Sequence, residues 1–178
     1  VDVDHGLDVV VSVWYLTNGF QGVPPGTVPE AGGLSSCQGF YIPSKYRWYF
    51  KTGMVDGWSG VISIGWGGAS ELEPVTGDWD GDGDDTIGYF VPSQNKWWLK
   101  NDLADGWSSV TGFNFGTADP MEPVTGDWDG DGVDTVGGYT AAKWRWYLKD
   151  DQVSGWSNVS ILKFGPAAAY QVLAGDWE

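Results

Sequence analysis

The chain of 178 residues has a single cysteine, Cys37, and a single histidine, His5. One cysteine excludes an internal disulfide framework, so stability must come from packing or from bound metal. One imidazole cannot supply the histidine base of repeated nucleophilic sites, and the obvious carboxylate pairs fall in short loops instead of a convergent acid and base set. We therefore expect no enzymatic activity.

Basic residues are also scarce, with 9 Lys and Arg against 24 Asp and Glu, for a formal charge of -15. Such an excess repels nucleic acid and anionic membranes. No apolar stretch approaches the ~20 residues needed to span a bilayer, so we expect no membrane insertion. The chain begins at Val1 without a signal-peptide pattern, which suits a mature exported protein or a trimmed piece equally. We expect an extracellular or cell-surface location.

Tryptophan and glycine are abundant, with 13 and 28 copies, and they recur at a fixed period. Gly-Asp-Trp recurs with its aspartate at Asp78, Asp127 and Asp176, two steps of 49 residues (127 − 78 and 176 − 127). The other markers that keep this period are an aromatic strand at Trp48, Trp97 and Trp146, a Gly-Trp-Ser turn at Trp58, Trp107 and Trp156, and an aromatic-Gly pair at Trp66, Phe115 and Phe164. A period of this length indicates a propeller, a solenoid or an array.

Each full period contains four strand patterns separated by turn residues, at 73–79, 86–90, 96–100 and 110–115 in the clearest copy. The sequence therefore predicts an all-β fold of four-stranded antiparallel repeats forming a small β-propeller or propeller-like array, with about 3.5 to 4 blades. We divide the single domain into a partial blade at 1–28, a blade without an acidic loop at 29–72, two blades at 73–121 and 122–170, and a closing or exchanged strand at 171–178.

The two ends of the sequence look like halves of one unit. Residues 171–178 match a first strand, and residues 1–8 match the acidic loop that follows such a strand. Pairing of these pieces would either close a small ring or join neighbouring molecules head to tail into a filament, because unpaired strand edges favour pairing. Both alternatives stay open.

Two acidic loops carry the chemistry. Each places carboxylates at positions 1, 3, 5 and 8 and glycine at position 6, with the residues Asp78, Asp80, Asp82 and Asp85 in one and Asp127, Asp129, Asp131 and Asp134 in the other. Alternating aspartates converge on one point when such a loop curls, and calcium tolerates the irregular set of oxygen ligands that results. The alternative is that the Asp-Gly pairs are only turns. An EF-hand does not fit, since its twelfth position would be Tyr89 or Gly138 in place of glutamate.

A third calcium site is a further hypothesis. It would combine Asp2, Asp4 and Asp8 from the N-terminal piece with Asp176 from the other end of the chain.

The pattern Pro-Val-Thr-Gly-Asp-Trp-Asp-Gly-Asp-Gly, followed by Gly-Tyr, Trp-Trp-Leu or Trp-Tyr-Leu and Phe-Gly, resembles the FG-GAP and VCBS-type repeats of bacterial surface proteins, integrin α-subunit propellers and some propeller lectins. The resemblance covers roughly residues 29–178. It implies a propeller blade whose calcium loop joins the first two strands, an extracellular location, and a role in adhesion, ligand recognition or structure. In the family the last carboxylate commonly stands at position 9, where this chain has Thr86 and Thr135.

Carbohydrate binding is the alternative function. Trp58, Trp107 and Trp156 could each offer a stacking platform for a sugar ring, or they could instead pack between neighbouring blades. A glycan or a surface protein is the expected ligand in an adhesive role. Asn158-Val-Ser160 is an N-glycosylation sequon.

Overall fold

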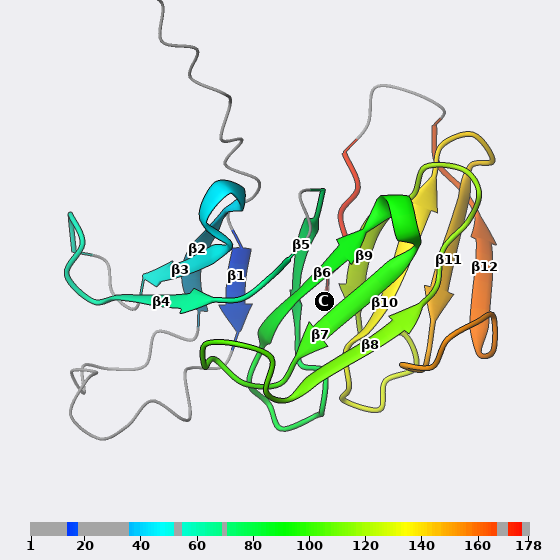
Figure 1. Cartoon of the computed structure of the whole chain (residues 1–178). Helices are drawn as coiled ribbons and strands as arrows, with labels where there is room; N and C mark the ends of the chain where they lie inside the picture. The colour runs from blue at the N-terminus through cyan, green and yellow to red at the C-terminus, as the bar shows by residue number, and fades with distance from the viewer. Residues whose placement is uncertain (1–13, 18–35, 52–54, 69–70, 167–170, 176–178) are drawn as a thin grey trace, which may run out of the picture.

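The computed structural model describes residues 14–17, 36–51, 55–68, 71–166 and 171–175 (Figure 1). In these ranges, twelve strands form three four-stranded antiparallel sheets, in which strands that follow one another in sequence are neighbours in space. The prediction of an all-β fold is confirmed. Among the described residues, no helix is long and apolar enough to cross a membrane.

Each sheet is a meander whose strands run in chain order. The first sheet contains β1 (Trp14–Thr17), β2 (Ser36–Ile42), β3 (Arg47–Lys51) and β4 (Val61–Gly65). The second contains β5 (Glu73–Gly77), β6 (Thr86–Val91), β7 (Lys96–Lys100) and β8 (Val110–Asn114). The third contains β9 (Glu122–Gly126), β10 (Thr135–Thr140), β11 (Arg145–Lys149) and β12 (Val159–Lys163).

The period of the sequence also holds for the strands themselves. Every strand of the third sheet begins and ends one full period after its counterpart in the second, and β3 and β4 precede β7 and β8 by the same step. The predicted strands at 73–79, 86–90, 96–100 and 110–115 coincide with β5 to β8 to within a residue or two at their ends. Equal local sequence therefore forms equal local structure.

The first sheet differs at its start. Its strand β1 comes from the stretch 1–28, which the sequence analysis assigned to a partial blade, and pairs with β2 from Trp14 opposite Gly39 to Thr17 opposite Ser36. At the other end of the chain, residues 171–175 form no strand.

The second and third strands of a sheet are joined by tight turns. Short 3₁₀ turns, η1 (Pro43–Lys45) and η2 (Pro92–Gln94), begin with proline, whose fixed φ suits the first position of such a turn. The next residue is left-handed, with φ of 49° at Tyr46 and 48° at Asn95, and its amide donates to the proline carbonyl oxygen. These turns set the register that aligns the aromatic strands.

The core lies between the sheets. Strand β3 alternates buried and half-buried residues, as the two-residue period of a strand requires, and buries Trp48 and Phe50. Between the first and second sheets, Trp48 and Trp66 pack in one cluster with Ile87 and Tyr89. A second cluster joins the second and third sheets and includes Trp97, Phe113, Phe115, Val136 and Tyr147.

The first strands of successive sheets are neighbours. Strand β5 contacts β9 on one side and β1 on the other. The Thr125 hydroxyl donates to the Thr76 carbonyl oxygen at 2.8 Å across the gap between β9 and β5. Because the acidic loops follow β5 and β9, this arrangement brings the two loops to the same edge of the molecule.

Candidate metal centre

The first acidic loop connects β5 to β6 and is organised around one carboxylate. The Oδ1 atom of Asp78 accepts hydrogen bonds from the amides of Gly81 at 2.8 Å and Asp82 at 3.1 Å, and its Oδ2 atom accepts from Gly83 at 2.8 Å. The φ angles of Gly81 and Gly83 are +73° and +93°, which side chains with a Cβ adopt at a cost. The glycines thus allow the loop to curl around its first aspartate.

The second loop, between β9 and β10, repeats this geometry. Asp127 accepts from the amides of Gly130 at 2.8 Å, Asp131 at 3.1 Å and Gly132 at 2.9 Å. The hydrogen bond from Gly132 is the main cause that lowers the pKa of Asp127, because it stabilises the ionised carboxylate. This aspartate is therefore held as an anion.

The curled loops gather carboxylates. Within the described part of the chain, Asp78, Asp80 and Asp82 form one group of three and Asp127, Asp129 and Asp131 form another, each with oxygen atoms within 4.8 Å of one another. Carboxylates at this separation repel, and a hard divalent cation bound between them would relieve the repulsion. The oxygen-only donor set suits calcium and lacks the nitrogen and sulfur that zinc and copper prefer.

One further side chain approaches each group from the end of the third strand. Asn101 follows β7 and donates its Nδ2 hydrogen to Asp80 Oδ2 at 3.0 Å. Asp150, which stands one period later and follows β11, shares a hydrogen bond with Asp129. Burial first, and then the charges of Asp129, Asp131 and Asp127, raise the pKa of Asp150.

The sequence analysis missed Asn101 and Asp150. The available signal was their common register, directly after the Trp-Trp-Leu-Lys and Trp-Tyr-Leu-Lys strands. The immediate neighbours of the two groups consequently differ, because an amide stands beside Asp80 where a carboxylate stands beside Asp129.

The aspartate at the eighth position of the second loop contacts the first aspartate of the first loop. Asp134 Oδ2 accepts a hydrogen bond from the Asp78 amide at 3.0 Å, and the Asp134 amide donates to the Asp78 carbonyl oxygen at 2.7 Å. Burial is the main cause that raises the pKa of Asp134, and the charges of Asp85, Asp78 and Asp127 add to it, against the lowering effect of the Asp78 amide. In the described residues, neither Asp85 nor Asp134 belongs to a group of three ligand atoms. Asp134 instead joins the second loop to the first.

The hypothesised third site, with Asp2, Asp4, Asp8 and Asp176, lies outside the described residues, as does His5. The sequon residue Asn158 is exposed in the turn before β12, and its Nδ2 atom donates to Asp151 Oδ2 at 3.0 Å.

The three turn tryptophans occupy equivalent places. Trp107 contacts Trp98 of its own sheet edge-on, with ring centroids 5.1 Å apart, and Trp66 of the preceding sheet at 6.0 Å. Trp156 likewise contacts Tyr147 at 5.4 Å and Phe115 at 5.3 Å. About half of each side chain, 53 % for Trp107 and 50 % for Trp156, is still exposed. Trp107 and Trp156 therefore join neighbouring sheets and also present an aromatic edge to solvent, whereas Trp58, at 67 % exposure, contacts Phe40 and Tyr49 of its own sheet.

Comparison with protein-family models, with curated proteins and with solved structures found no match to this chain.

Proposed function

We propose that this protein is a non-enzymatic calcium-binding module of the β-propeller type that serves a structural or adhesive role outside the cell. The observation that carries the proposal is the recurrence, one period apart, of a loop that gathers three carboxylates around an aspartate already held by three backbone amides. A single acidic turn arises often, whereas the same geometry in two equivalent loops favours a common ligand.

The hydrogen bonds to Asp78 and Asp127 from loop amides support binding of a cation without extensive reorganisation. The loop backbone is already curled, so that the carboxylates of Asp80 and Asp129 stand beside those of Asp82 and Asp131. Little ordering entropy then opposes binding, and an affinity in the ~10⁻⁴ to 10⁻³ M range of extracellular calcium modules is expected.

The propeller part of the proposal is supported by the meander in each sheet and by the side-by-side placement of β1, β5 and β9. The resemblance of roughly residues 29–178 to FG-GAP and VCBS-type repeats, most specific at the loops that begin with Asp78 and Asp127, supports a membership in that group and an extracellular location. A calcium ion in each loop would tie the first strand of a sheet to the second and reduce the loop's freedom.

The test is a calcium titration followed by calorimetry, in parallel with thermal melting. The intact chain should bind calcium at two loops and melt at a higher temperature than in chelator. A third binding event would support the hypothesised site of Asp2, Asp4, Asp8 and Asp176. The double variant Asp129→Asn with Asp131→Asn should lose one binding event and keep the other. Absence of any binding heat or melting shift in the intact chain would reduce the loops to turns and end the proposal.

Carbohydrate binding is the second candidate, favoured by the half-exposed rings of Trp107 and Trp156. Aromatic faces stack on sugar rings, so a glycan array probed with the intact chain and with Trp107→Ala tests it. Specific binding that the variant loses, while its urea unfolding transition stays cooperative, would place the lectin function first.

A further inference from the structure

The two junctions between sheets are built in the same way. At the first, the Gly106 amide donates to the Gly65 carbonyl oxygen at 2.9 Å. At the second, the Gly155 amide donates to the Asn114 carbonyl oxygen at 2.9 Å. Donor and acceptor at the second junction each stand one period after their counterparts at the first. The Asp-Gly-Trp or Ser-Gly-Trp turn of each sheet thus binds the last residue of the outer strand of the preceding sheet.

A second hydrogen bond runs in the opposite direction. The Gly65 amide donates to Asp105 Oδ1 at 2.6 Å, and the Asn114 amide donates to Ser154 Oγ at 3.1 Å. The residue before the turn glycine therefore acts as acceptor at each junction, and an aspartate and a serine both serve.

An aromatic residue completes each junction. The ring that follows the outer strand, Trp66 at the first and Phe115 at the second, is 2 % exposed. It lies under the turn tryptophan of the next sheet and beside a lysine, with Lys100 Nζ 6.0 Å from the Trp66 ring centroid and Lys149 Nζ 5.6 Å from that of Phe115. The junction is an aromatic ring held between a tryptophan and a lysine.

One half of this junction is exposed on the third sheet. Phe164 stands one period after Phe115 and is 69 % exposed, and Ile161 and Leu162 of β12 are about half exposed. Within the described residues no further sheet follows β12. An apolar edge of this kind is typical of a surface that has a partner.

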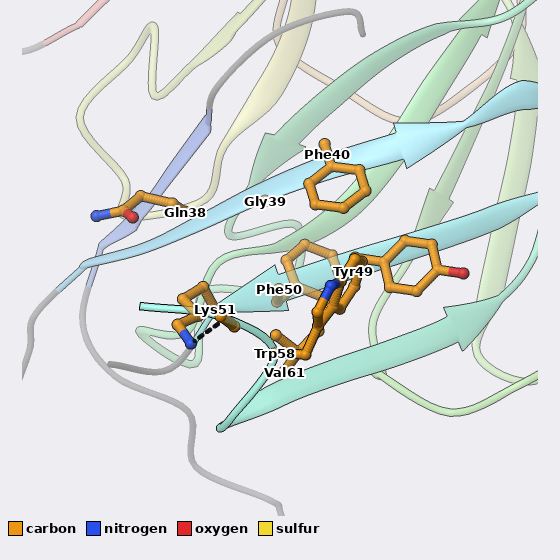
Figure 2. A pocket seen from close by; sticks show the side chains of 9 residues that line it. Gln38, Gly39, Phe40, Tyr49, Phe50, Lys51, Trp58 and Val61 are labelled. Atoms are coloured by element: carbon orange, nitrogen blue, oxygen red, sulfur yellow. Dashed lines mark hydrogen bonds between the residues drawn. The ribbon is translucent and has the colours of Figure 1, made fainter. Parts of the chain in front are cut away.

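The other half is exposed on the first sheet (Figure 2). A groove of about 360 Å³ is lined by Phe40, Tyr49, Lys51 and Trp58, together with five neighbouring residues that include Phe50. Phe40 and Tyr49 stack with ring centroids 5.1 Å apart, and Trp58 stands edge-on to both. Lys51 Nζ donates to the Gly57 carbonyl oxygen at 2.8 Å and so holds the turn that carries Trp58.

The residues of the groove correspond, one period earlier, to residues of the second sheet that face the first sheet. One period after Phe40, Tyr49, Lys51 and Trp58 stand, in the same order, Tyr89, Trp98, Lys100 and Trp107. Tyr89, Lys100 and Trp107 surround Trp66, and Trp98 packs against Trp107. The groove therefore has the tryptophan, the lysine and the aromatic wall that receive a ring at the internal junctions.

We propose that the β12 edge of one copy of this chain docks into the Phe40–Trp58 groove of a second copy, with Phe164 between Trp58 and Lys51, and so repeats the internal junction between molecules. The expected backbone hydrogen bond runs from the Gly57 amide to the Lys163 carbonyl oxygen, at the place of Gly106 and Gly65. This docking joins intact sheets and requires no exchange of strands. It is independent of the proposed cation site.

Charge and placement favour a second copy as the occupant. Asp56 precedes Gly57, at the place of Asp105, and would lie beside Lys163, so that opposite charges meet. The groove belongs to the first sheet, and β12 lies at the opposite end of the molecule (Figure 1). The two halves consequently cannot meet within one copy in this arrangement, whereas a heterologous contact between copies extends into a chain.

The test is sedimentation velocity over a range of protein concentration, in calcium and in chelator. The intact chain should show an average mass that rises with concentration beyond that of a dimer. Phe164→Asp and Trp58→Ala each remove one half of the contact and should weaken association by about 30-fold, as loss of a central aromatic anchor does. Tyr46→Asn changes another exposed aromatic residue to the type found at its counterpart Asn95 and should associate like the intact chain.

Mixing provides the decisive result. At a concentration that lies between the Kd of the intact chain and the weaker Kd of the variants, each variant alone should stay largely monomeric. An equimolar mixture should form a dimer and nothing larger, because the intact Phe164 edge of Trp58→Ala fits the intact groove of Phe164→Asp. Phe164→Ser replaces Phe164→Asp if the melting temperature shows that the charge disturbs the third sheet. An intact chain that stays monomeric at every concentration, or a mixture that does not dimerise although both variants are folded, would overturn the proposal. Protection of residues 159–164 from hydrogen exchange in a monomer, lost in Trp58→Ala, would assign the groove to the same chain and overturn it as well.

Discussion

Asp134 and Asp78 hold each other through two hydrogen bonds, one from the Asp134 amide to the Asp78 carbonyl oxygen at 2.7 Å and one from the Asp78 amide to Asp134 Oδ2 at 3.0 Å. The pair links the second acidic loop to the start of the first and spans two sheets. A cation bound in one loop would therefore restrict a residue that supports the other. This link gives the two loops a physical route for coupling.

Replacing Asp134 tests that link. Asp134→Ala leaves the half-buried Asp78 amide without its acceptor and should lower the free energy of unfolding in chelator by about 1–2 kcal/mol. Asp134→Asn keeps an acceptor oxygen and removes a charge that Asp85, Asp78 and Asp127 repel, so it should cost less. Urea denaturation of the two variants measures the difference. Equal stability of Asp134→Ala and the intact chain would show that the bond contributes nothing.

The Asp134 carboxyl should also make the stability of the calcium-free protein depend on pH. Because burial raises the pKa of Asp134 in the folded state, the folded protein binds the proton more tightly than the unfolded chain does. Its contribution to stability is then favourable at low pH and decreases as the pH rises from the ordinary carboxyl range through the raised pKa. The intact chain should lose stability relative to Asp134→Asn over this interval. A constant difference between the two would contradict the prediction.

Asp102 should have the opposite effect, because its contribution to stability should decrease as the pH falls. Burial alone would raise its pKa, but hydrogen bonds from Lys100, at 2.5 Å, and from Ser108 and other neighbours lower the pKa to about 2. A lowered pKa stabilises the fold above the ordinary carboxyl range, and this stabilisation is lost as the pH falls from about 4 to about 2. Because Asp102 is partly exposed, we expect about 1 kcal/mol. Denaturation of Asp102→Asn and the intact chain over this interval should give converging stabilities, and parallel curves would contradict the assignment.

The difference between Asn101 and Asp150 predicts that the two proposed cation sites differ in calcium affinity. Asn101→Asp should raise the calcium affinity of the first loop, and Asp150→Asn should lower that of the second, each by about tenfold, because charge count and neighbouring ligands tune affinity. Asn101→Asp should also lower the melting temperature in chelator, since it adds a carboxylate beside Asp80. Titration calorimetry measures the calcium affinities, and scanning calorimetry measures the melting temperature.

Gln94→Glu is the matched control for this exchange. It adds the same charge in η2, at the end of the sheet opposite the acidic loop, and should leave calcium affinity unchanged. If Asn101→Asp and Gln94→Glu shifted the affinity equally, the effect would be one of net charge instead of local contact.

A comparison of Trp107 with Trp58 distinguishes the stability gained from packing between sheets from that gained within a sheet. Trp107 contacts Trp98 and also Trp66 across the junction, whereas Trp58 contacts Phe40 and Tyr49 of its own sheet. At concentrations where the chain is monomeric, Trp107→Ala should therefore cost about 1 kcal/mol more than Trp58→Ala. Chemical denaturation of the two variants measures this difference, and equal costs would mean that the junction contact is not stabilising.

Sequence spacing predicted the strands of the second and third sheets because their information is local. Aromatic strand patterns and Asp-Gly loops each specify the conformation of a few neighbouring residues, and the fixed period repeats them in the two sheets. The groups at Asp78, Asp80 and Asp82 and at Asp127, Asp129 and Asp131 followed from the same local periodicity. The place of β1 did not, since pairing with β2 joins residues separated by a long connection.

The sequence by itself determined that this protein is built from short antiparallel strands and that two loops carry closely spaced carboxylates, because both properties depend on residues near one another in the chain. Only the tertiary structure decided that Asn101 and Asp150 reach those loops, that Asp134 supports the neighbouring loop, and that Phe164 and the Trp58 groove are exposed although their counterparts pack together at a junction. These relationships join residues from different strands or different sheets, and packing places them where no local pattern specifies their contact.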